Sequence, residues 1–179
     1  MNCRRSLEHG LALVELALIL PLLLLLVLGV IDFSRAIQFN NILINLSREG
    51  ANLSARTTEQ PENIFRALID TATPFDMNAD GMMYITKLVG RKDGRANVEE
   101  QHRPATGGKQ SLSSRVWKCS SWAGGKCNVP NTRPVFTLPN DIQLTEGETV
   151  YAVEALYDYT LLTRYVISDD PKLYSITIL

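Results

Sequence analysis

Three cysteines and two histidines are the side chains best suited to covalent or metal chemistry in this chain. Cys119 and Cys127 bracket the segment SSWAGGK, whereas Cys3 lies near the N-terminus. In an exported domain, Cys119 and Cys127 can form a disulfide that stabilises it by roughly 2–3 kcal/mol in the chain-entropy model. Two free thiols are an alternative. A zinc site is a poorer fit, because two sulfurs and the distant His102 provide fewer than four ligands.

The segment Asp76-Met77-Asn78-Ala79-Asp80-Gly81 resembles the first half of a calcium-binding loop, with oxygen ligands at alternate positions and glycine at the sixth. The twelfth position is Lys87, where such a loop needs a bidentate glutamate. A glycine-containing turn capped by Asp and Asn explains the same residues without an ion. We therefore predict no metal site, and Asp76, Asn78 and Asp80 are only a weak calcium candidate.

The remaining motifs do not predict catalysis. Gly107-Gly108-Lys109 and Gly124-Gly125-Lys126 lack the Ser or Thr and the upstream Gly of a phosphate-binding loop. The balance of 18 Lys+Arg against 19 Asp+Glu is unlike that of a nucleic-acid binder, which needs clustered positive charge. We expect a protein with no enzymatic activity, no cofactor and no nucleic-acid partner.

Residues 11–31 form a nearly uninterrupted apolar run, LALVELALILPLLLLLVLGVI. A helix of this length rises about 31 Å, which matches a bilayer core of about 30 Å. Arg4 and Arg5 precede the run, so the positive-inside rule places the N-terminus in the cytoplasm and the rest of the chain across the membrane. A secretory signal peptide is the alternative, but its apolar core is normally about 7–15 residues long.

Glu15 is the one ionisable residue inside this run. An ionised carboxylate costs on the order of 2.5 kcal/mol in a membrane helix, and less near the interface. One interpretation is that Glu15 extends to the lipid headgroups. In the other, cleavage between Gly10 and Leu11 creates an α-amino group on Leu11 that neutralises Glu15 of a neighbouring chain and sets subunit register. Pro21 removes one backbone hydrogen bond and should kink the helix.

The segment from His9 to about Arg56 combines several of these features. A short leader ends in Gly10, a glutamate follows five residues later, the apolar run contains a proline, and I-D-F-S-R and S-R-E-G-A follow. Together they resemble the type IV prepilin class and, more narrowly, the TadE-like minor pilins of the tight-adherence pilus system. Ser47 stands where that family usually has Ala, and Leu16 where an aromatic residue often follows the glutamate. The resemblance implies cleavage after Gly10 by a prepilin peptidase.

Beyond the span, an apolar stripe from Ala36 to Leu53 recurs every three or four residues and predicts a continuing amphipathic helix. Gln60-Pro61-Glu62 predicts the start of a second helix that ends near residue 73. In residues 149–159, Tyr and Val alternate with Glu154 and Asp158, which predicts an antiparallel sheet with one face on a helix. The strands are expected at residues 82–89, 114–118, 149–159 and 173–179, with two or three short strands within 103–147.

We therefore predict an α+β fold in which a long N-terminal transmembrane and amphipathic helix packs on a small antiparallel β-sheet. The expected segments are a prepilin-type leader at 1–10, a transmembrane helix at 11–31, an amphipathic extension at 32–58 and a periplasmic α+β domain at 59–179.

The resemblance implies a minor pilin or pseudopilin of the bacterial inner membrane that takes part in pilus assembly. Its expected partners are the prepilin peptidase, other pilin and minor pilin subunits, and membrane lipids. The alternative is a single-pass membrane-anchored periplasmic binding module that is not processed. Substitution of Glu15 separates the two, because only the pilin requires that carboxylate for assembly.

Overall fold

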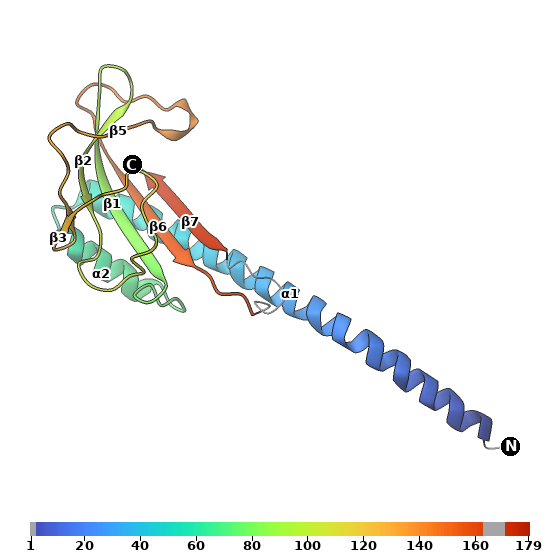
Figure 1. Cartoon of the computed structure of the whole chain (residues 1–179). Coiled ribbons are helices and arrows are strands. Elements are labelled where there is room, and N and C mark those ends of the chain that lie inside the picture. Colours follow the sequence, from blue (N-terminus) through green and yellow to red (C-terminus); the bar gives the residue numbers. More distant parts are fainter. Residues whose placement is uncertain (1–2, 163–170) are drawn as a thin grey trace. The chain divides into compact units, whose positions relative to one another are not determined.

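The computed structural model describes residues 3–162 and 171–179, with side chains from residue 13 onward, and it divides into two compact units (Figure 1). The first consists of Met1–Gln38 and Thr160–Asp170, and the second of Phe39–Tyr159 and Pro171–Leu179. Helix α1 (Cys3–Arg56) contributes residues to both units. The second unit therefore begins within the segment predicted as the amphipathic extension.

The second unit is built on one antiparallel sheet of seven strands. The strands run in the order β3-β4-β2-β1-β6-β7, and β5 also pairs with β2, so β1 is central between β2 and β6. Their bounds are Gly81–Gly90 (β1), Ala96–His102 (β2), Trp122–Ala123 (β3), Lys126–Cys127 (β4), Val135–Phe136 (β5), Thr149–Asp158 (β6) and Lys172–Ile178 (β7), with a short 3₁₀ helix η1 at Pro139–Asp141.

Helices cover one face of this sheet, namely the C-terminal part of α1 together with α2 (Pro61–Thr71) (Figure 1). In α2, Pro61 occupies the first turn, where a missing amide hydrogen costs nothing, and Glu62 complements the positive helix end. The apolar face of α2 is buried through Ile64, Phe65 and Leu68. The predicted second helix is thus confirmed, although it ends slightly earlier than expected.

The buried stripe of α1 is held on the sheet by both apolar and hydroxyl contacts. Leu43 and Leu46 are buried, and the Phe39 ring lies 4.1 Å from the Phe75 ring, centroid to centroid. Ser47 is fully buried, and its Oγ lies 2.8 Å from Oγ of Ser175 on β7. Because each hydroxyl can donate to another, these groups are satisfied without water. The predicted α+β fold, with a helix on an antiparallel sheet, is confirmed.

The opposite face of the sheet is also covered, by irregular segments between β2 and β6. Residues 111–118, here called the covering segment, bring Leu112 and Val116 into two apolar clusters on that face. The clusters contain Met82, Tyr84, Leu112 and Leu156 in one, and Leu88, Ala96, Val98, Val116, Leu138, Leu144 and Ala152 in the other. The expectation of a sheet packed on one face only is therefore incomplete.

One strand prediction was wrong, and one long strand was not predicted. Residues 114–118 are not a strand, because this segment is bound through its backbone and hydroxyl groups to the buried side chain of Glu154 instead of to a neighbouring strand. Residues 96–102 were not predicted, yet they form β2, which pairs with β1 along most of its length. The polar sequence of β2 conceals the strand because pairing with the central β1 outweighs its low intrinsic preference.

Candidate functional site

The apolar part of α1 is the most unusual surface of the chain. Every large apolar side chain from Leu13 to Ile31 is between 37% and 75% exposed. Among the described residues, Leu13–Arg56 is the one helix long and apolar enough to cross a membrane. An exposed apolar surface of this extent marks a membrane or protein contact in natural proteins. The helix therefore suggests a membrane anchor.

Glu15 lies on this helix and is exposed, with Leu18 and Ile19 one turn further along. Within the described residues it has no hydrogen-bond or ion-pair partner, so its carboxylate is available to a group from outside the chain. The backbones of Gly10 and Leu11 lie in α1, but their side chains fall outside the described part. The helix continues through Pro21, whose ring leaves the carbonyl of Ala17 without its usual amide donor. The predicted roles of four residues remain proposals, namely those of Gly10, Leu11, Glu15 and Pro21.

Asp32 is a residue whose role the sequence analysis did not recognise. It follows the apolar run directly, is 3% exposed, and accepts a hydrogen bond of 2.9 Å through Oδ1 from the backbone N–H of Leu162. A buried carboxylate requires such donors, because desolvation otherwise makes the charge costly. Asp32 thus connects α1 to the segment that follows β6. In the sequence, the position of Asp32 directly after an apolar run was the one feature that set it apart.

A disulfide joins Cys119 and Cys127 across the β3–β4 hairpin. The tryptophans beside it are both half-buried anchors: Trp117 packs against the Leu88 cluster, and Trp122 packs against Tyr84. The guanidinium of Arg103 lies 4.3 Å from the Trp122 ring centroid on this hairpin. Burial raises the pKa of Tyr84 above its usual value. This corner of the sheet is therefore rigidly cross-linked.

The predicted calcium candidate forms a turn that is closed by its own side chains and tied to Lys109. Oδ1 of Asp76 accepts hydrogen bonds from the backbone N–H groups of Asn78 and Ala79, at 3.1 and 3.0 Å. Asp80 pairs with Lys109, whose ammonium also lies 2.7 Å from Asp158. The hydrogen bond to Asp158, followed by that to Asp80, raises the pKa of Lys109. The ammonium group of Lys109 therefore neutralises the Asp80 carboxylate, as a bound cation would.

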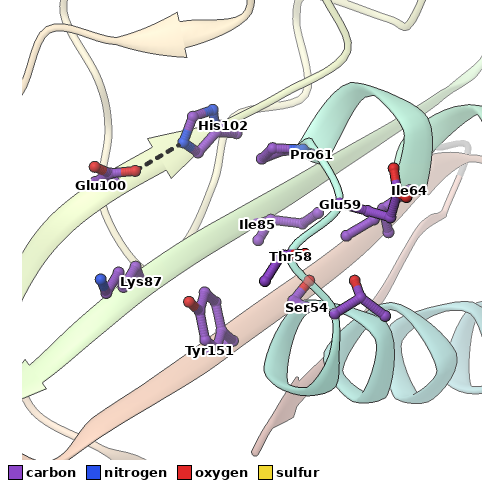
Figure 2. Close-up of a pocket in the computed structure, with 11 residues that line it drawn as sticks. Ser54, Thr58, Glu59, Pro61, Ile64, Ile85, Lys87, Glu100, His102 and Tyr151 are labelled. Atoms are coloured by element: carbon purple, nitrogen blue, oxygen red, sulfur yellow. Dashed lines mark hydrogen bonds and ion pairs between the residues drawn. The ribbon is translucent and has the colours of Figure 1, made fainter.

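A pocket of about 310 Å³ lies where α1 ends and α2 begins, over β1, β2 and β6 (Figure 2). Ser54 on its wall is 8% exposed, and its Oγ has no hydrogen-bond partner among the described residues. Glu100 lies 3.2 Å from Nε2 of His102 and 3.3 Å from Nζ of Lys126. Burial alone would raise the pKa of Glu100, but these two partners outweigh it and lower that pKa. The pocket thus combines positive and negative groups and favours no one class of charged ligand.

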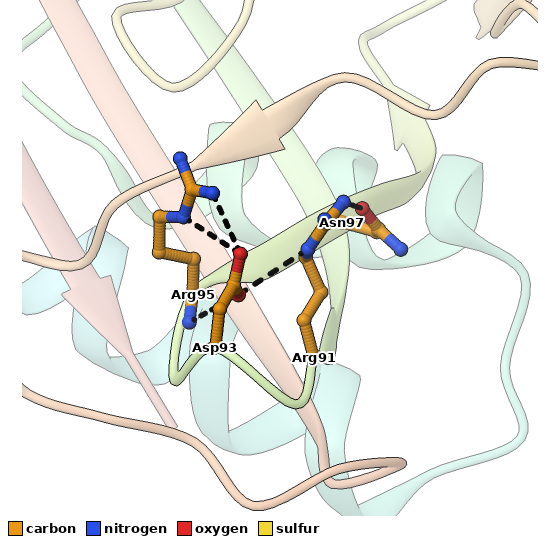
Figure 3. A network of polar contacts seen from close by, with 4 residues as sticks. All are labelled: Arg91, Asp93, Arg95 and Asn97. Carbon is orange, nitrogen blue, oxygen red and sulfur yellow. Dashed lines mark hydrogen bonds and ion pairs between the residues drawn. The ribbon is translucent and has the colours of Figure 1, made fainter.

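The turn between β1 and β2 carries a second polar cluster (Figure 3). Asp93 accepts hydrogen bonds from Arg95 at 2.6 and 3.0 Å and from Arg91 at 3.3 Å. The hydrogen bond from Arg95 is the main cause that lowers the pKa of Asp93. Arg91 also donates to Asn97 at 2.9 Å. These contacts close the exposed hairpin between β1 and β2.

Residues 10–52 match the family model described as TadE-like protein. The match covers about a quarter of the chain, runs from Gly10 into the buried part of α1, and confirms the resemblance over that segment. It suggests a protein associated with the tight-adherence pilus. Comparison with curated proteins and with solved structures finds no match.

Proposed function

We propose that this chain is a TadE-like minor pilin or pseudopilin that takes part in assembly of a tight-adherence (Flp-type) pilus. A prepilin peptidase cuts it after Gly10, and the mature chain starts at Leu11. It resides in the bacterial inner membrane with its N-terminus cytoplasmic and its α+β domain periplasmic, and it enters or supports the growing pilus. It works by non-covalent assembly and is not an enzyme.

The observation that carries this proposal is the position of Glu15 on the exposed apolar face of α1, within the segment that matches the TadE-like family. A membrane anchor needs only the apolar residues. A carboxylate among them costs free energy unless a cation from outside the chain pairs with it. The new amino group of a neighbouring Leu11 is such a cation, and pairing with it fixes the register of adjacent helices.

Pro21 supports the same proposal. Loss of one backbone hydrogen bond at Pro21 lets the helix bend where subunits pack against each other.

The alternative function, an unprocessed single-pass anchor that carries a periplasmic binding module, is favoured by the pocket beside Ser54. In that alternative Glu15 extends to the lipid headgroups and needs no partner chain.

Substitution of Glu15 separates the two functions. Glu15→Ala and Glu15→Gln are made in the full chain, expressed with the other pilus components, and cross-linked in the membrane. In the pilin both variants lose assembly, because glutamine keeps the polarity but not the charge that pairs with an amine. Glu49→Ala, an exposed glutamate on the same helix, is the matched control and assembles normally. Normal assembly of Glu15→Gln at equal membrane content contradicts the pairing role.

A further inference from the structure

A second pocket, of about 270 Å³, lies between the covering segment and the end of β6 next to β7. It belongs entirely to the second unit. Three serines, three leucines and three basic residues line it. These are Ser111, Ser113, Ser114, Leu112, Leu156, Leu173, Arg115, Lys118 and Lys172.

The charge of this lining is one-sided. Arg115, Lys118 and Lys172 contribute three positive charges, and no acidic side chain of the described residues lines the pocket. Within the described residues none of these three cations forms an ion pair with a carboxylate, although other basic residues of the domain do. The pocket beside Ser54, in contrast, has both Glu59 and Glu100 in its wall. Three unpaired cations around one concavity create a positive potential that attracts an anion.

A buried network holds the covering segment in place beneath this pocket. Glu154 is 0% exposed and accepts hydrogen bonds from the Ser114 hydroxyl, from the N–H of Arg115 at 2.7 Å and from the N–H of Val116 at 3.3 Å. The Tyr174 hydroxyl donates a further one. These donors satisfy the carboxylate and fix the backbone of the covering segment at Arg115 and Val116.

The same network positions one of the three cations. The guanidinium of Arg115 lies 4.0 Å from the centroid of the Tyr174 ring, a favourable cation–π distance. Its backbone is fixed by Glu154 at the same time. A side chain held at both ends loses little conformational entropy when a ligand binds. Lys118 of the covering segment and Lys172 of β7 line the same pocket.

We propose that this pocket binds a tetrahedral oxyanion, a phosphate or sulfate group that is free or carried as a small monoester. Arginine and lysine are the usual donors to such groups, and the exposed hydroxyls of Ser111 and Ser113 supply neutral donors. The leucine side chains form an apolar wall for the organic part of a monoester. This site goes beyond the proposed pilus function and does not depend on it.

Calorimetric titration of the full chain in micelles of a neutral detergent tests the site. The probes are inorganic phosphate, sulfate and glycerol 3-phosphate, each compared with chloride at equal ionic strength. The wild type binds phosphate or sulfate with measurable heat, and the double variant Lys118→Gln/Lys172→Gln binds at least about tenfold more weakly, because it lacks two charge-assisted donors. The matched control Lys87→Gln/Lys92→Gln loses the same charge outside the pocket and binds as the wild type does.

Tighter binding of glycerol 3-phosphate than of inorganic phosphate supports the site and assigns an esterified group as its ligand. The reverse order supports the site and assigns the free anion. The proposal is overturned if none of the three probes binds more than chloride does, or if the two double variants lose affinity equally, since general surface charge would then explain the binding. Because all four substituted lysines are partly or fully exposed, folding is retained in both variants.

Discussion

The hydroxyl of Tyr174 on β7 donates a hydrogen bond of 3.1 Å to Oε1 of the fully buried Glu154 on β6. The same carboxylate binds the covering segment, so one side chain connects two strands with the irregular layer over them. Burial is the main cause that raises the pKa of Tyr174, and the negative charge of Glu154 adds to it. Glu154 therefore adds a polar anchor to the apolar clusters that hold the second face of the sheet.

Glu154→Gln should destabilise the second unit by about 1–3 kcal/mol, because an amide NH₂ group then faces donors that need an acceptor. Chemical denaturation of the full chain in micelles, followed by tryptophan fluorescence, measures this loss. Glu99→Gln is the control, since that carboxylate pairs with Arg133 at the half-exposed edge of the sheet and should change the free energy of unfolding by about 1 kcal/mol or less. Equal losses in the two variants would contradict the central role of Glu154.

Gly50→Val should destabilise the packing of α1 on the sheet by about 1–3 kcal/mol through overpacking. A Cβ at Gly50 would lie 2.9 Å from Cγ1 of Val153 and 3.1 Å from Cδ1 of Leu68. Both neighbours are buried and cannot move aside easily. The midpoint of thermal unfolding measures the effect. Asn52→Val, at an exposed position of the same helix, controls for the poor helix preference of valine and should retain most of the stability.

Asp93 should titrate below the usual aspartate pKa of about 3.9, because Arg95 stabilises its charged form. A depressed pKa means that the contribution of this group to stability is present above the unfolded-state pKa and is lost as the pH falls through the folded-state pKa. Carbon-13 NMR of the Asp93 carboxyl measures the titration. Arg95→Gln should raise the Asp93 pKa towards its usual value, whereas Arg66→Gln should not change it. An unshifted Asp93 in the wild type would contradict the role of Arg95.

The cysteines report on which side of the membrane the domain lies. A mature chain that begins at Leu11 lacks Cys3, and its two remaining cysteines are joined in the disulfide. Alkylation in cells without a reductant should therefore add no label to the mature chain, and two labels after reduction. Cys119→Ser should acquire one label at Cys127 without reduction. Two labels on the unreduced wild type would place the domain in a reducing compartment and contradict the periplasmic assignment.

Strong periodicity made both helices and the long strands β1, β6 and β7 predictable from the sequence. The alternation of residues 149–159 also correctly predicted that Glu154 points away from the helices. Its burial could not be predicted, because it depends on the covering segment, which has no periodicity and is positioned by the carboxylate itself. Contacts between residues 40 positions apart leave no local pattern in the sequence.

In the candidate sites too, local sequence signals could be predicted and contacts between distant residues could not. Glu15 and the disulfide stood out because a charge in an apolar run and a closely spaced cysteine pair are local signals. The oxyanion pocket combines Arg115 and Lys118 with Lys172, which comes from a strand near the C-terminus, so only the folded chain shows that they share a concavity. Asp32 likewise depends on Leu162, far along the chain.

The most direct test of the proposed function is the intact mass and N-terminal sequence of the full chain after expression with a prepilin peptidase. The proposal predicts a mature chain that starts at Leu11 and no cleavage when the peptidase is inactive. An uncut chain that starts at Met1 would contradict processing and favour the simple membrane anchor. A chain that starts at Ile37 would show that a signal peptidase removes the apolar helix and that the domain is secreted.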